Sequence, residues 1–109
     1  MRIWVIGAGQ AGAEALRQLQ KNDEISVVVS ALVADPPAVR NKVIAKVDYV
    51  ENVTPVNINT LARRIRPDLI LIDSTAQETG LSRVTGGTAL SQALTFEIAA
   101  ASDFPCLVI

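Results

Sequence analysis

The chain has 109 residues, half of them hydrophobic, and a formal net charge of −1. This length suits one domain around one hydrophobic core, and the balanced charge favours neither a nucleic-acid-binding surface nor an anionic membrane surface as partner. The sequence holds no histidine and one cysteine. It therefore lacks the commonest general base and metal ligand and cannot form an internal disulfide, so we expect no metal site.

No apolar run is as long as a membrane span, and the run at residues 3–6 is too short for the apolar core of a targeting signal. We therefore expect a cytoplasmic chain without membrane insertion, folded as one domain over residues 1–109. No nucleophile–base pair can be identified from the sequence, which argues against a self-contained catalyst.

A glycine-rich motif follows the first apolar run. Residues 1–6 are short and apolar, residues 7–12 read Gly-Ala-Gly-Gln-Ala-Gly, and residues 13–21 are compatible with a helix. This is the strand, Gly-x-Gly-x-x-Gly turn and helix of a dinucleotide-binding unit. In that unit the first glycine allows the sharp turn, the second admits the pyrophosphate, and the third lets the helix pack on the strand. The candidate cofactor-binding residues here are Gly7, Ala8, Gly9, Gln10, Ala11 and Gly12.

The rest of the chain alternates between apolar, β-branched runs and helix-compatible segments. We expect further strands at residues 25–33, 48–50, 68–73 and 104–109, and helices at residues 36–45, about 58–66 and 88–101. Alternation with strands that are apolar on both faces predicts a parallel sheet covered by helices on both sides. Right-handed crossovers then give a Rossmann-like α/β three-layer sandwich with five strands in the order 3-2-1-4-5.

This layout resembles the N-terminal NAD-binding domains of the TrkA type, which regulate potassium transport, and the nucleotide-binding halves of Gfo/Idh/MocA-type dehydrogenases. Residues 3–12 fit both groups. Thr54 matches the threonine of the Gly-Asp-Ala-Thr segment that TrkA-type domains carry near the adenine, and Asn52 replaces its aspartate. Ser74 and Thr75 fall where that family has Ala-Thr beside the cofactor. The resemblance implies that these four residues contact a dinucleotide.

The acid that binds the ribose 2′-hydroxyl is expected at the end of the second strand. By TrkA-type spacing this residue is Ser30, which could donate to a 2′-phosphate with help from Arg40 or Lys42, and this arrangement favours NADP. If the strand is longer, residues 31–36 resemble the Val-Ala-Asp-Pro segment of the Gfo/Idh/MocA group, and Asp35 would hold the ribose of NAD. Asp35 could instead cap the following helix. We expect NAD or NADP as the cofactor and favour NAD slightly.

Two weaker candidates lie later in the chain. Asp73 ends the fourth strand at the carboxyl edge of the sheet, where it could contact the nicotinamide ribose or simply begin a solvated turn. Gly86 and Gly87, followed by Thr88, could form a second helix start that faces phosphate, or a loop end with an ordinary N-cap.

Three functions remain open from the sequence. The first is a dinucleotide-binding module that senses or regulates, with a separate catalytic or transport subunit as a candidate partner. The second is a nucleotide-binding fragment or subunit of an NAD(P)-dependent oxidoreductase. The third is a Rossmann-like interaction domain without bound nucleotide. Whether the chain alone is an enzyme stays open, and the missing histidine argues against it.

The last helix and the last strand predict a homodimer. The segment 88–101 carries apolar residues on more than one face, with Phe96 among them, although an outer helix needs only one apolar face. The run Cys106-Leu107-Val108-Ile109 would leave an open apolar edge on the sheet. A two-fold dimer through the helix, the strand or both would cover these surfaces.

Overall fold

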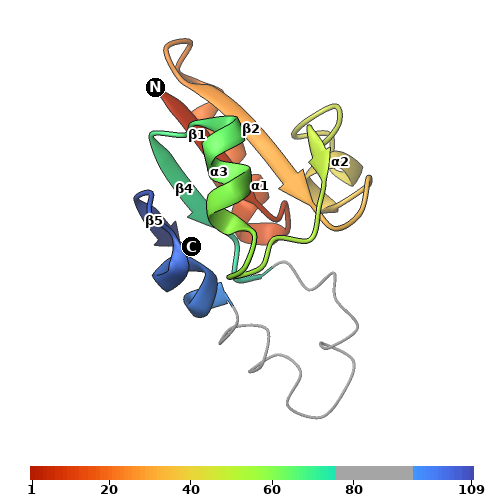
Figure 1. Cartoon of the computed structure of the whole chain (residues 1–109). Coiled ribbons are helices and arrows are strands. Elements are labelled where there is room, and N and C mark those ends of the chain that lie inside the picture. The colour runs from red at the N-terminus through yellow and green to blue at the C-terminus, as the bar shows by residue number, and fades with distance from the viewer. Residues whose placement is uncertain (76–94) are drawn as a thin grey trace.

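The computed structural model describes residues 1–75 and 95–109. Within these ranges the strands are β1 (Arg2–Ile6), β2 (Ser26–Ala31), β3 (Tyr49–Val50), β4 (Leu69–Ile72) and β5 (Cys106–Val108). They form one sheet in the order β3-β2-β1-β4-β5, and each pair of neighbours is parallel (Figure 1). The predicted fold class and strand order are confirmed.

Helices cover the two faces of this sheet. They are α1 (Gln10–Leu19), α2 (Pro37–Arg40) and α3 (Ile58–Ile65), and residues 95–101 are also helical. Of the helix predicted at residues 88–101, residues 95–101 are confirmed, while residues 88–94 lie outside the described ranges, as do Gly86 and Gly87. No helix in the described ranges is long and apolar enough to cross a membrane.

Alternate residues of β1 point into two different cores. Val5 packs in a cluster with residues of α1 and α2, while Trp4 packs in a cluster with residues of α3 and of the helix at 95–101, and both side chains are fully buried. Figure 1 shows α3 in front of the sheet and α1 behind it. The period of two along a strand explains this division, because successive side chains leave opposite faces of the sheet.

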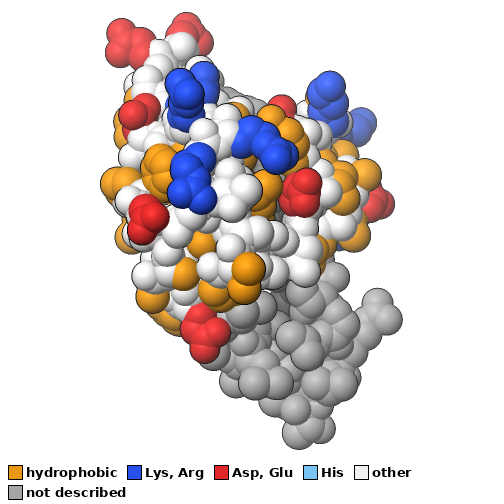
Figure 2. Space-filling model, viewed as in Figure 1, with side chains coloured by type: hydrophobic (Ala, Val, Ile, Leu, Met, Phe, Trp, Pro, Cys, Tyr) orange, Lys and Arg blue, Asp and Glu red, His pale blue; other side chains and the backbone are white. Residues whose placement is uncertain are grey.

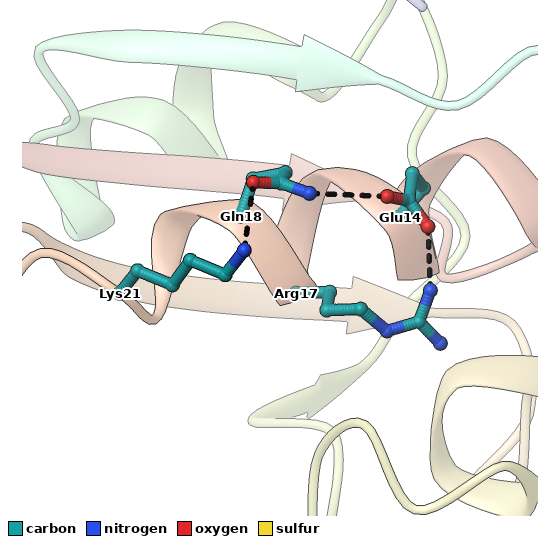
Figure 3. A network of polar contacts seen from close by, with 4 residues as sticks. All are labelled: Glu14, Arg17, Gln18 and Lys21. Atoms are coloured by element: carbon teal, nitrogen blue, oxygen red, sulfur yellow. Dashed lines mark hydrogen bonds and ion pairs between the residues drawn. The ribbon is translucent and has the colours of Figure 1, made fainter.

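The outer face of α1 is polar. Glu14 accepts hydrogen bonds from Arg17 and Gln18, and Lys21 donates to Gln18 (Figure 3). These residues are three or four positions apart, the spacing that brings side chains together on a helix. The hydrogen bond from Gln18 and the positive charge of Arg17 lower the pKa of Glu14. The network covers the solvent side of α1 and leaves its other side for the core.

The exposed side of α3 is basic near its carboxyl end. Arg63, Arg64 and Arg66 are exposed, and Figure 2 shows Lys and Arg side chains on the face of the molecule that carries α3. Positive charges are favourable at the carboxyl end of a helix, where the helix dipole is negative. This cluster therefore has a structural explanation within α3 itself.

Several predicted elements are shorter in the structure, and the lengths of two of them bear on the candidate site. The second strand ends at Ala31 and not at residue 33, so the longer strand required by the Gfo/Idh/MocA-like register does not form. The second helix ends at Arg40 and not near residue 45, because Lys42 adopts a left-handed backbone with φ of 61°. After it, the amides of Val43 and Ile44 turn back to the carbonyl of Ala38.

Candidate functional site

The turn after β1 has the backbone that its glycines predict. Gly7 has a φ of 81°, a conformation that residues with a Cβ rarely adopt. Its amide donates to the carbonyl of Ser30 at 2.7 Å, which holds the turn against the end of β2. The chain then reaches the first residue of α1 after only Ala8 and Gly9. The turn therefore lies at the carboxyl edge of the sheet, between the ends of β1 and β2.

Gly12 is required by close packing. A Cβ at this position would lie 2.6 Å from the carbonyl oxygen of Gly7 and 2.7 Å from Oδ2 of Asp73. Both distances are shorter than any normal contact of a Cβ, and the oxygen of Gly7 belongs to the backbone and cannot swing away. The third glycine thus lets α1 approach the end of β1, as the motif predicts.

The first turn of α1 is capped by side chains from the end of β4. Its N-cap residue is Gly9, which has no side chain to accept a hydrogen bond from the helix amides. Instead, Oγ1 of Thr75 accepts from the amide of Ala11 at 3.0 Å, and Oδ2 of Asp73 accepts from the amide of Gly12 at 2.7 Å. These are the two amides that an N-cap side chain would normally satisfy. The cap is therefore supplied from a different part of the chain.

Asp73 and Thr75 are also bonded to each other. Both the amide and the hydroxyl of Thr75 donate to Oδ1 of Asp73, at 2.7 Å and 2.6 Å. The Asp73 side chain is buried, with 4% of its residue surface exposed, and both its oxygens accept hydrogen bonds. A carboxylate at a helix N-terminus is favourable because the helix dipole is positive there. Asp73 thus fixes a negative charge beside the glycine turn, and the alternative of a solvated turn is excluded.

The outermost amides of the glycine turn have no hydrogen-bond acceptor in the described part of the chain. Among the residues that the structure describes, the amides of Ala8, Gly9 and Gln10 donate to no protein acceptor. Gln10 is exposed, while Ala8 and Gly9 are buried. Buried backbone amides normally have a partner, and amides at the start of a helix suit an anion. This part of α1 has the chemistry to bind a phosphate or another anionic group.

The segment at α2 lies against the same turn. The amide of Ala38 donates to the carbonyl of Ala8 at 3.1 Å. Asp35 precedes this contact by three residues and is exposed, as are Arg40 and Lys42. The N-cap of α2 is Pro36, and no side chain of the described residues caps this helix, so the expectation that Asp35 caps it is wrong. Asp35 is left exposed at the carboxyl edge of the sheet.

Ser30 lies at the end of β2, beside the glycine turn, with its side chain buried. Its side chain is 1% exposed, and its hydroxyl oxygen accepts a hydrogen bond from Nε1 of Trp4 at 2.9 Å. Ser30 pairs with Ile6 in the sheet, so its side chain leaves the face that packs against α3. In this structure the hydroxyl is bonded to the core residue Trp4, and its contact with a 2′-phosphate stays a prediction.

The remaining predicted residues surround the ends of β3 and β4. Asn52 is exposed, and its backbone carbonyl accepts from Nδ2 of Asn57. Thr54 and Asn57 hydrogen-bond reciprocally, each side chain accepting from the amide of the other, which stabilises the start of α3. Ser74 donates through its hydroxyl to the carbonyl of Ile109, at the end of β5. Thr75 therefore joins the glycine turn in this structure, whereas Asn52, Thr54 and Ser74 bond to neighbouring backbone.

Sequence reasoning missed the joint role of Asp73 and Thr75 as a cap. One signal for it exists, since the glycine at the start of α1 cannot cap the helix and a strand that ends beside it continues as Asp-Ser-Thr.

In the described ranges no group of three His, Cys, Asp or Glu side chains has the geometry of a metal site. Cys106 is half-buried, and burial raises the pKa of its thiol.

Comparison with known proteins supports the fold. No family model matches the sequence, and no curated protein matches it. A solved structure of UDP-GlcNAc 2-epimerase from Neisseria meningitidis, bound to UDP-GlcNAc, superposes on the whole chain with a TM-score of 0.56 and 18% sequence identity. The chain has a Rossmann-like fold. It spans 32% of the length of that epimerase chain, so the likeness concerns one part of a larger enzyme.

Proposed function

We propose that the chain is a dinucleotide-binding module that holds NAD(H) or NADP(H) by the pyrophosphate at the start of α1 and acts in sensing or regulation. The observation that carries this proposal is the set of amides at Ala8, Gly9 and Gln10, which donate to no acceptor among the described residues. They lie at the positive end of the α1 dipole, on a turn whose N-cap is glycine.

The surroundings of the turn supply a position for the adenosine ribose. The contact between Ala38 and Ala8 brings the segment that carries Asp35 to the edge beside β2. Residues 30–34 at the end of β2 contain no carboxylate, so Asp35 is the first acid after β2 in the sequence that could hold a ribose 2′-hydroxyl. Replacement of Asp35 with alanine should weaken NAD binding more than NADP binding in calorimetric titration. An equal effect on the binding of both cofactors would show that Asp35 does not contact the ribose 2′-hydroxyl.

In this proposal the module binds a dinucleotide and catalyses no reaction by itself. The chain has no histidine, and the only acid buried in the described ranges, Asp73, is bonded through both oxygens. A role in an oxidoreductase would then need a substrate-binding domain from elsewhere. The length of the natural gene product would distinguish these two functions, because a regulatory module would be short and a part of an enzyme would belong to a longer protein.

Calorimetry on a matched pair of variants tests the binding mode. Gly9→Val places a branched side chain where the pyrophosphate approaches the backbone, and it should abolish NAD binding while the circular dichroism spectrum stays that of the folded chain. Gln10→Ala changes an exposed side chain and leaves the amide in place, so it should bind like the wild type. Binding that survives Gly9→Val unchanged would contradict the proposal.

One observation favours a second function, a Rossmann-like interaction domain that binds no nucleotide. Asp73 and Thr75 already accept from two amides of the first helix turn, and the negative charge of Asp73 opposes a nearby diphosphate. The calorimetric experiment separates the two functions. Failure of NAD, NADP and UDP-GlcNAc to bind would support the interaction domain, and tighter binding of UDP-GlcNAc than of either dinucleotide would favour a nucleotide-sugar site.

A further inference from the structure

Asp73 is unusual among the acids of this chain because it is buried. It is the only buried carboxylate in the described ranges, with 4% of the residue exposed. Three hydrogen bonds hold it, from the amide of Gly12 and from the amide and hydroxyl of Thr75. Its charge therefore has a fixed position at the carboxyl end of β4, where little water screens it.

The sheet order relates Asp73 to the two halves of a dinucleotide. β2 lies on one side of β1 and β4 lies on the other. If the pyrophosphate binds at the turn between β1 and α1, and the adenosine ribose lies toward β2 and Asp35, the other half of the molecule extends toward β4. The nicotinamide half then passes the end of β4, which is where Asp73 lies.

We infer, on the basis of the proposed function, that Asp73 makes the site distinguish dinucleotides by charge and that NAD⁺ binds more tightly than NADH. The two forms have the same phosphates, riboses and adenine, and they differ by one positive charge on the nicotinamide ring. A fixed carboxylate attracts the charged ring and has no such interaction with the neutral one. For two unit charges about 8–10 Å apart, Coulomb's law with an effective dielectric constant of about 20 gives a preference of roughly fifteenfold to thirtyfold.

The test is a calorimetric titration of NAD⁺ and NADH into the wild type and two variants. Asp73→Asn removes the charge and keeps an acceptor oxygen of similar size, so the ratio of the two dissociation constants should fall to about one. The affinity for NADH should also rise, because the repulsion between Asp73 and the diphosphate disappears. Asp23→Asn removes one negative charge from the exposed turn between α1 and β2, at the opposite edge of the sheet, so it should preserve the wild-type ratio.

The outcomes separate this inference from the function on which it rests. If neither cofactor binds the wild type, the proposed function fails and the inference fails with it. If both bind the wild type equally, or if NADH binds more tightly, the function stands and the inference is overturned, whether or not Asp73→Asn folds. A preference for NAD⁺ that persists unchanged in folded Asp73→Asn would also overturn it, because the preference would then have another source.

Discussion

The amide of Gly12 donates a hydrogen bond of 2.7 Å to Oδ2 of Asp73, and a Cβ on residue 12 would lie 2.7 Å from the same oxygen. The absence of a side chain at residue 12 is therefore what lets the buried carboxylate reach the helix. This pair fixes the start of α1 to the end of β4, and it makes the glycine motif part of the packing as well as a candidate phosphate site.

Gly12→Ala should destabilise the fold. The new methyl group would lie 2.6 Å from the backbone oxygen of Gly7, and α1 would have to move away from β1. We expect a loss of about 3 kcal/mol in the free energy of unfolding, at the upper end of typical overpacking costs. Urea denaturation followed by circular dichroism measures it. A loss below about 1 kcal/mol in the free energy of unfolding would contradict this, because it would show that α1 can move away from β1 at little cost.

Thr75→Val should weaken the cap of α1. The substitution keeps the shape of the side chain but removes the oxygen that accepts from the amide of Ala11 and donates to Asp73. The expected loss is about 1–2 kcal/mol, the usual cost of removing an N-cap residue. Thr60→Val is the control, because Thr60 is exposed on α3 and no hydrogen bond of its side chain is part of the cap. Equal stability of Thr75→Val and the wild type would contradict the capping role.

Ser30→Ala should affect stability and leave cofactor binding unchanged. The indole N–H of Trp4 would lose its acceptor inside the core, which costs about 1–3 kcal/mol. Trp4 is the only tryptophan of the chain, so its fluorescence reports the change directly. If Ser30→Ala instead weakens NADP binding at unchanged stability, the hydroxyl reaches the ligand and the TrkA-like register holds.

The homodimer stays a prediction that the structure makes more specific. Phe96 is 62% exposed and Leu107 is 55% exposed, whereas Val108 packs against the core cluster that contains Trp4. Sedimentation at micromolar concentration should show a dimer, and Phe96→Glu or Leu107→Glu should dissociate it without unfolding the chain. A monomeric wild type would contradict the prediction, and a dimer that resists both substitutions would place its interface elsewhere.

Much of the architecture could be predicted because its signals are local. The glycine motif and the alternation of apolar runs with helical segments predict the parallel sheet and its order. The end of β2 could not be predicted in the same way, because apolar residues continue to Val33. The strand stops at Ala31, where its pairing partner β3 stops at Val50. The end of α2 depends on one left-handed residue, Lys42, that has no sequence signature.

In the candidate site, too, the local features could be predicted from the sequence and the long-range contacts could not. Residues 7–12 could be located from spacing alone, because a turn and a helix start are local structures. The cap from Asp73 and Thr75 joins residues 61 and 64 positions apart in the sequence, and no periodicity reports such a contact. The face on which Ser30 lies depends on its register with Ile6, which the sequence pattern does not determine. In the structure its hydroxyl is bonded to the core residue Trp4.

Amide NMR during an NAD⁺ titration tests the central claim most directly. If the pyrophosphate binds at the start of α1, the amide resonances of Ala8, Gly9 and Gln10 should shift most and saturate together, because their N–H groups gain an anionic acceptor. The indole resonance of Trp4, buried on the other face with Ser30, should stay in place. Saturating shifts confined to other residues, or no shifts at millimolar NAD⁺, would contradict the account.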